Sequence, residues 1–173
     1  MENLRDLIER SFDEHAERPA LRVLDEGDAA NQYHPIAYAE LRQRRDRLAC
    51  GLARMGLRKG HRIGILTDGG TEPIVVFLAA DLLGLTAVPL CHKTSTEILV
   101  HSISRAGLEM LVVDDRGWEQ FVAIRGALHQ PPRILLTRGA AGEGTSWEDA
   151  QVEGSPPFVE LTAQDESKIL FTS

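Results

Sequence analysis

The residues of this chain that could do chemistry fall in short polar clusters, and each cluster follows a run of apolar residues. Cys91 and His92 form one cluster, with His101 further along. These three could bind a transition metal, or Cys91 could act as a nucleophile with His92 as its base. Their spacing matches no recurrent metal site, however, and sequence neighbours rarely have nucleophile–base geometry. We therefore expect no metal site and no catalytic residue within this chain.

Two further clusters could hold ions of opposite sign. The carboxylates of Asp114–Asp115 could bind Mg²⁺, but they stand between an apolar run and a helical pattern, so a capping turn before Trp118 is favoured. Gly69–Gly70 stands where an anion could bind a helix N-terminus. Asp68 beside it disfavours an anion, and we expect a structural turn there.

The segment Gly139–Ser146 has the outline of a phosphate-binding loop, G-x-x-x-x-G-[ST]. The residue after Gly144 is Thr145, where a lysine should reach the phosphates. Glu143 would also bring negative charge towards a polyphosphate. A surface loop is the favoured interpretation. No G-x-G-x-x-G follows any expected strand, so a nicotinamide or flavin site has no support.

Charge and composition exclude several classes of protein. Lys and Arg total 19 against 26 Asp and Glu, which gives a net charge of −7 and disfavours a nucleic-acid partner. The four arginines of Arg42–Arg47 are expected on a solvated helix face, compensated by Glu40 and Asp46. No apolar stretch reaches the roughly 18 residues needed to span a bilayer. Two cysteines make no disulfide framework, and we expect a reduced, cytoplasmic protein.

The elements that must position these clusters alternate regularly along the chain. Helical periodicity or capping signals predict helices over about 4–15, 39–55, 71–83, 94–106 and 118–128. Short apolar or extended runs predict strands over 21–24, 33–38, 63–66, 86–90, 110–113, 133–136 and 167–171, with a loop over 137–157 containing one helical turn. Such βαβ units build a mostly parallel sheet that binds ligands beyond the carboxyl ends of its strands. We expect one α/β domain over residues 1–173.

Four segments, in this order, resemble one known family. Ile36–Leu41 (IAYAEL) is similar to its T-Y-x-E-L motif, and Gly56–Ile65 (GLRKGHRIGI) to its G-V-x-x-G-D-R-V-A-I. Ala79–Leu90 (AADLLGLTAVPL) is similar to A-x-x-x-x-G-A-x-x-V-P-L. Asp165–Ser173 (DESKILFTS) resembles the run into the phosphate-binding loop T-S-G-[ST]-[ST]-G-x-P-K-G. The family is the adenylate-forming superfamily, which contains acyl- and aryl-coenzyme A synthetases, peptide-synthetase adenylation domains and luciferases.

The resemblance implies the N-terminal portion of the large domain of an ATP-dependent ligase. Such an enzyme converts a carboxylic acid and Mg·ATP into an acyl-adenylate and pyrophosphate. It then passes the acyl group to a thiol of coenzyme A or of a carrier protein's phosphopantetheine. Thr172 and Ser173 would be the first residues around the ATP phosphates, and the remaining machinery would lie beyond Ser173.

The resemblance also implies how the chain behaves alone. The 173-residue chain is expected to be inactive as a fragment and to self-associate through exposed sheet surface. His61 and Cys91–Lys93 depart from the family pattern and leave the subfamily and acid open. Two alternatives stay open as well: a stand-alone α/β nucleotide-binding module and a non-catalytic interaction domain.

Overall fold

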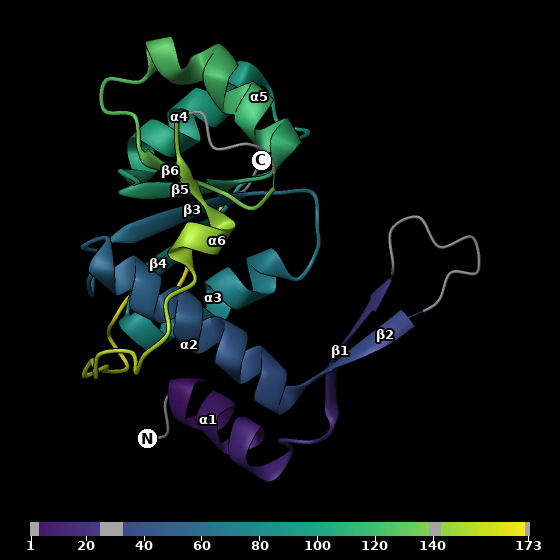
Figure 1. Ribbon diagram of the computed structural model, residues 1–173. Helices are drawn as coiled ribbons and strands as arrows, with labels where there is room; N and C mark the ends of the chain where they lie inside the picture. Colours follow the sequence, from purple (N-terminus) through teal and green to yellow (C-terminus); the bar gives the residue numbers. More distant parts are fainter. Residues whose placement is uncertain (1–3, 25–32, 139–142, 172–173) are drawn as a thin grey trace.

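The computed structural model describes residues 4–24, 33–138 and 143–171. Helices and strands alternate over most of this length (Figure 1). The helices are α1 (Leu4–Glu14), α2 (Tyr38–Arg54), α3 (Glu72–Leu83), α4 (Thr96–Ala106), α5 (Asp115–Ile124), the 3₁₀ turn η1 (Arg125–Ala127) and α6 (Trp147–Ala150). The strands are β1 (Pro19–Leu24), β2 (Tyr33–Ala37), β3 (Arg62–Leu66), β4 (Thr86–Pro89), β5 (Met110–Val113), β6 (Arg133–Leu136) and β7 (Thr145–Ser146).

The predicted parallel sheet is confirmed. Five strands lie in the order β4-β3-β5-β6-β7, and every neighbouring pair is parallel. The register places Ile63 beside both Ala87 and Met110. A separate antiparallel pair, β1 and β2, extends away from this sheet (Figure 1). Among the described residues, no helix has the length and apolar character needed to cross a bilayer.

Both faces of the sheet are buried, because side chains alternate along each strand. In β5, Met110 and Val112 pack into the core beneath α2 and α3, whereas Leu111 and Val113 pack into the core beneath α4 and α5. The two helical layers lie on opposite sides of the sheet (Figure 1). This explains why the strands read as uninterrupted apolar runs.

Local signals set most helix ends. Gly84 and Gly107 end α3 and α4 with φ of 65° and 60°, in the left-handed region that glycine adopts readily. The Ser95 side chain caps α4 by accepting a hydrogen bond from the Ile98 backbone N–H. Thr71, a residue type that often caps helices, precedes α3, but its side chain makes no capping hydrogen bond.

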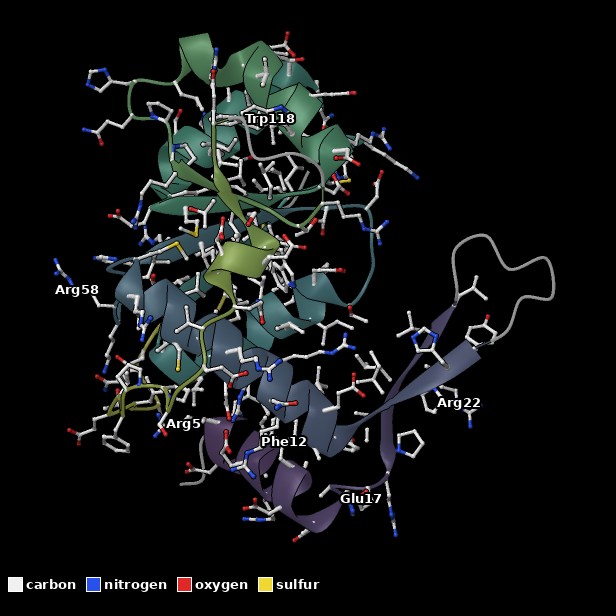
Figure 2. All side chains as sticks on the ribbon, viewed as in Figure 1. Arg5, Phe12, Glu17, Arg22, Arg58 and Trp118 are labelled. Atoms are coloured by element: carbon white, nitrogen blue, oxygen red, sulfur yellow. The ribbon has the colours of Figure 1, made fainter. Side chains whose placement is uncertain are left out.

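The arginine run does not lie wholly in solvent, which corrects the sequence expectation. Arg45 is 3% exposed, because it lies one helical turn after Leu41 and one before Leu48 on the face of α2 that α1 covers. Its guanidinium pairs with Glu9 and lies 4.7 Å from the centre of the Phe12 ring. Phe12 projects between α1 and α2 in Figure 2.

The C-terminal third differs most from the prediction. The helical turn expected within the loop over 137–157 is confirmed as α6, whereas β7 was not expected. α6 packs against α2 so closely that a Cβ on Gly51 would overlap the carbonyl oxygen of Ala150. The expected strand over 167–171 is reduced to a single parallel bridge between Lys168 and Ala87. A single bridge forms because only the backbone around Ser167 and Ile169 reaches β4.

Candidate functional site

The parallel strands all end at one edge of the sheet, and a polar residue follows each of three neighbouring strands there. Asp68 follows β3, His92 follows β4, and Asp114 follows β5. From β3 the chain passes outward to β4 and then crosses back to β5, so α3 and α5 lie on opposite faces. The chain reverses its direction across the sheet between the ends of β3 and β5, and doubly wound sheets bind ligands outside the carboxyl ends of their strands at such a point.

His92 is buried at this edge, with 5% of its surface exposed. Its Nδ1 lies 2.7 Å from Oε1 of Gln120, and Nε2 of Gln120 donates to the His92 carbonyl oxygen at 2.9 Å. Because the Gln120 amide nitrogen is already the donor, its Oε1 must accept, and Nδ1 of His92 carries the proton. In the neutral ring, Nε2 then has an open lone pair. Nε2 is buried and has no hydrogen-bond partner among the described residues.

Two carboxylates face this nitrogen. The distance from His92 Nε2 to Asp114 Oδ1 is 3.5 Å, and the distance to Asp68 Oδ1 is 3.7 Å. Both distances are longer than a hydrogen bond between charged groups. All three ligand atoms lie within 4.8 Å of one another. The structure thus brings together three side chains from three separate strand ends.

The backbone holds both carboxylates in place. Asp114 caps α5, as predicted: its Oδ1 accepts from the Gly117 N–H at 2.8 Å. Its Oδ2 accepts from the Asp68 N–H at 2.7 Å, which joins the segments that follow β5 and β3. Oδ2 of Asp68 accepts from Arg116 at 2.9 Å. Gly117 itself lies so close to β3 that a Cβ would overlap the Leu66 carbonyl oxygen.

The C-terminal segment runs towards the same edge. The Ala87 N–H donates to the Ser167 carbonyl at 2.9 Å, and the Ile169 N–H donates to the Ala87 carbonyl at 3.0 Å, in parallel pairing beside β4. Phe171 then lines a hollow of about 730 Å³ together with Leu90 and other residues around the end of β4. The predicted phosphate contacts Thr172 and Ser173 lie outside the described residues.

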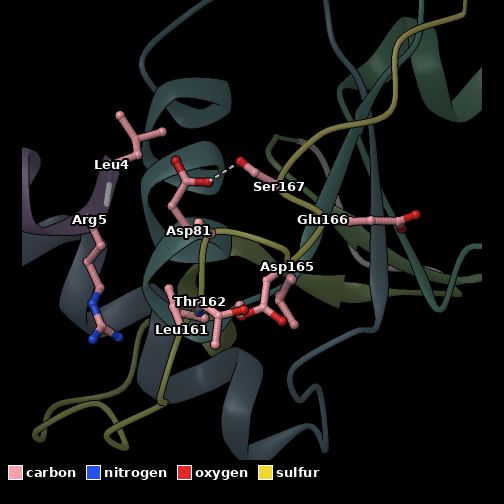
Figure 3. Close-up of a pocket in the computed structure, with 11 residues that line it drawn as sticks. Leu4, Arg5, Asp81, Leu161, Thr162, Asp165, Glu166 and Ser167 are labelled. Carbon is pink, nitrogen blue, oxygen red and sulfur yellow. Dashed lines mark hydrogen bonds between the residues drawn. The ribbon is translucent and has the colours of Figure 1, made fainter. Parts of the chain in front are cut away.

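A second cavity, of about 270 Å³, lies at the opposite edge, near the amino end of β4 (Figure 3). It is enclosed by α1, the end of α3 and the segment 161–167. Its polar groups pair with one another: Oδ1 of Asp81 accepts from the Ser167 hydroxyl at 2.9 Å, and its Oδ2 lies 3.5 Å from Nζ of Lys168. These contacts anchor the C-terminal segment against the end of α3.

An exposed ion pair secures the same segment. A hydrogen bond from Lys59, together with one from the Thr162 backbone N–H, lowers the pKa of Asp165. The distance between Lys59 Nζ and Asp165 Oδ2 is 2.8 Å. The pair ties the segment to the loop that follows α2.

The other sequence candidates separate in space. Cys91 and His101 are exposed and form no ligand cluster with His92 among the described residues. Gly69 and Gly70 form a turn with positive φ, as expected. Gly139 to Gly142 lie outside the described residues, and the remainder of that segment contributes β7. Burial raises the pKa of the Cys50 thiol, so this residue is an inert part of the packing.

Sequence reasoning considered His92 and Asp114 separately and did not join them to Asp68. The signal that could have identified these three residues together was their position relative to the strands. Each residue comes shortly after a buried parallel strand, and such strand ends share one edge.

Comparison with known proteins places this chain in a family. The model of the AMP-binding enzyme family matches residues 8–173. An acyl-CoA ligase of Aspergillus fumigatus is 33% identical over 155 residues, which cover 79% of this chain and 26% of the relative. An acetyl-coenzyme A synthetase of Alkalilimnicola ehrlichii is 26% identical over 185 residues, covering 96% of this chain and 28% of the relative. The chain thus spans about a quarter of the length of these curated relatives.

The fold agrees with that match. The solved structure of acetoacetyl-CoA synthetase from Streptomyces lividans superimposes with a TM-score of 0.85 at 17% identity, and the match covers 98% of this chain and 28% of that one. At this identity the likeness concerns the fold alone. The family model, however, spans nearly the whole chain. The chain belongs to the AMP-binding enzyme family, in which it corresponds to the N-terminal part of the adenylate-forming fold.

Proposed function

We propose that this chain is the N-terminal part of an ATP-dependent ligase that activates a carboxylic acid as an acyl-adenylate and then forms an acyl thioester. One observation carries the proposal. The segment that ends the chain pairs in parallel with β4 and runs to the carboxyl edge of the sheet, where ligands of parallel sheets bind. The family match and the acyl-CoA ligases among the relatives support the same reaction class.

In this proposal ATP, with its Mg²⁺, enters as a substrate. The carboxyl edge carries Asp68, Asp114 and His92, which do not fit a polyanion. The phosphates would therefore be held by Thr172, Ser173 and the rest of the loop in the longer protein, through hydroxyl and backbone N–H groups. The relatives named as coenzyme A ligases and synthetases favour coenzyme A over a carrier-protein phosphopantetheine as the thiol. We place the enzyme in the cytoplasm.

The chain alone is proposed to be inactive, because the family resemblance places the rest of the phosphate-binding loop and the remaining machinery beyond Ser173. It is also proposed to self-associate. Phe158 and Leu170 are 85% and 69% exposed, and both belong to the C-terminal stretch that runs along the molecule's surface. Contact of these side chains with a second copy of the chain would remove their apolar surface from water.

The test measures pyrophosphate release by the protein encoded by the reading frame that contains this chain. With Mg·ATP, release should depend on an added carboxylic acid, and acyl-coenzyme A should accumulate when coenzyme A is present. The 173-residue chain, assayed in parallel, should release none. Replacing Ser173 by Ala should lower the rate of adenylate formation. The control is Ser155→Ala, which precedes the proposed phosphate-binding loop in the sequence and should leave that rate unchanged.

The alternatives give different results with the 173-residue chain. A rise in melting temperature with Mg·ATP would identify a stand-alone nucleotide-binding module and overturn the proposal. Ordered self-association, with no acid-dependent pyrophosphate release from the encoded protein, would identify an interaction domain.

A further inference from the structure

We propose that His92, Asp68 and Asp114 form a binding site for a divalent transition metal, Zn²⁺ above all. The inference is independent of the ligase proposal, since it rests on three side chains at the switch point of the sheet. An imidazole nitrogen with two carboxylate oxygens suits zinc, whereas magnesium prefers oxygen ligands alone.

The buried nitrogen is the main argument. His92 is 5% exposed, and its Nε2 is buried with no hydrogen-bond partner among the described residues. Burying a polar atom without a partner is unfavourable, by about 1–3 kcal/mol for a typical group. This nitrogen points at two carboxylates at 3.5 and 3.7 Å, too far for good hydrogen bonds. A cation between the three groups would satisfy all of them.

The two spacings from His92 Nε2 to the carboxylate oxygens are close to those around a tetrahedral ion. Zinc–nitrogen and zinc–oxygen bonds of about 2.0–2.2 Å place neighbouring ligand atoms of a tetrahedron roughly 3.3–3.6 Å apart. An octahedral magnesium site, with bonds of about 2.1 Å, would need adjacent ligands roughly 3 Å apart. The separations of 3.5 and 3.7 Å lie nearer the tetrahedral value.

The residues behind the ligands are arranged as in protein metal sites. Metal-binding histidines almost always donate their other ring N–H to an oxygen, which fixes the tautomer and the ring orientation. Nδ1 of His92 does so to Gln120, whose own orientation is fixed by its bond to the His92 carbonyl. Asp114 is held by the backbone N–H groups of Gly117 and Asp68.

One side of the trio opens to solvent. The side chain of Asp68 is 53% exposed, and Arg116 occupies its Oδ2, which leaves Oδ1 on the side of His92. Three protein ligands with an open fourth position are typical of zinc sites that hold a water or a small ligand. The fourth ligand proposed here is water.

The experiment titrates the chelator-washed 173-residue chain with ZnCl₂ in a calorimeter, after circular dichroism has confirmed that it is folded. We expect one zinc per chain. Asp68→Ala should weaken binding at least tenfold, and its exposed position makes loss of folding a small risk. Gln120→Ala should weaken binding about 10- to 100-fold, the usual cost of removing a partner behind a metal ligand. His101→Ala, an exposed histidine on α4, is the matched control and should bind zinc as the wild type does.

A second readout reports the geometry. CoCl₂ in place of zinc should give the intense visible bands of tetrahedral cobalt, and Asp68→Ala should abolish them. The proposal is overturned if the washed chain takes up no zinc, or if Asp68→Ala and His92→Asn bind it as tightly as the wild type. It is equally overturned if MgCl₂ competes with zinc at equal concentration. Should His92→Asn fail to fold, Asp68→Ala decides the question.

Discussion

Arg45 and His92 are both polar side chains buried to a similar degree, at 3% and 5% exposure, but their surroundings differ. Arg45 lies between α1 and α2, where its guanidinium pairs with Glu9 and Asp46 and packs over the Phe12 ring. His92 lies at the carboxyl edge of the sheet, where one ring nitrogen is bonded to Gln120 and the other faces two carboxylates without a hydrogen bond.

The difference separates structural from functional burial. A buried charge that has all its partners contributes to the particular way in which two helices meet. A buried nitrogen without a hydrogen-bond partner lowers the stability of the fold, because its lost hydration is not replaced by a protein contact. The comparison therefore assigns the α1–α2 contact to the architecture, and it supports the proposed metal site at the ends of β3, β4 and β5.

The largest effect is expected from Arg45→Met. Removing the guanidinium leaves the carboxylates of Glu9 and Asp46 uncompensated beside apolar surface, and the free energy of unfolding should fall by about 3 kcal/mol. The value lies at the lower end of the range for buried pairs because both carboxylates are partly exposed. Urea unfolding followed by circular dichroism measures it.

Two further variants give stability losses with which that of Arg45→Met can be compared. Arg44→Met removes an exposed pair with Glu40 and should cost at most about 0.5 kcal/mol. His92→Asn, measured without metal, should cost about 1–2 kcal/mol, because it removes one hydrogen bond to Gln120. A loss equal to that of Arg45→Met would show that His92 is as structural as Arg45, and the comparison would fail.

A smaller effect than that of Arg45→Met is expected from Gly117→Ala. The added Cβ would overlap the Leu66 carbonyl oxygen, so the start of α5 must shift away from the end of β3, at a cost of about 2 kcal/mol. Gly126→Ala is the control, since a Cβ there meets nothing within 4 Å, and it should change stability by less than about 0.5 kcal/mol. The prediction is wrong if the two variants unfold at the same urea concentration.

The sequence predicted the sheet well because its signals are local. Strands such as Met110–Val113 are uninterrupted apolar runs in the sequence. Gly84 and Gly107 mark helix ends, because glycine readily adopts the left-handed conformation that these ends require. The parallel βαβ order followed from the alternation of such signals. The phosphate contacts Thr172 and Ser173 stay a prediction, because they lie outside the described residues.

What the sequence did not predict depends on contacts between distant residues. Arg45 looked solvated because arginine usually is, and only the position of α1 over α2 buries it. Asp68, His92 and Asp114 are separated by whole βα units, so no spacing rule joins them. The segment after Ser167 has apolar residues typical of a strand but makes one bridge, because only its first part reaches β4.

The smallest effect is expected at the exposed pair of Lys59 and Asp165, the solvent-side counterpart of the buried Arg45 contacts. The hydrogen bonds from Lys59 and from the Thr162 N–H lower the pKa of Asp165 in the folded chain. A carboxyl group with a lowered pKa stabilises the fold above its unfolded-state pKa, and this contribution is lost as the pH falls through the folded-state value. Urea midpoints of the wild type and Asp165→Asn should therefore differ near neutral pH and converge in acid. A difference that persists unchanged below the range where aspartates titrate would mean that the hydrogen-bond geometry of this residue, and not its charge, anchors the segment.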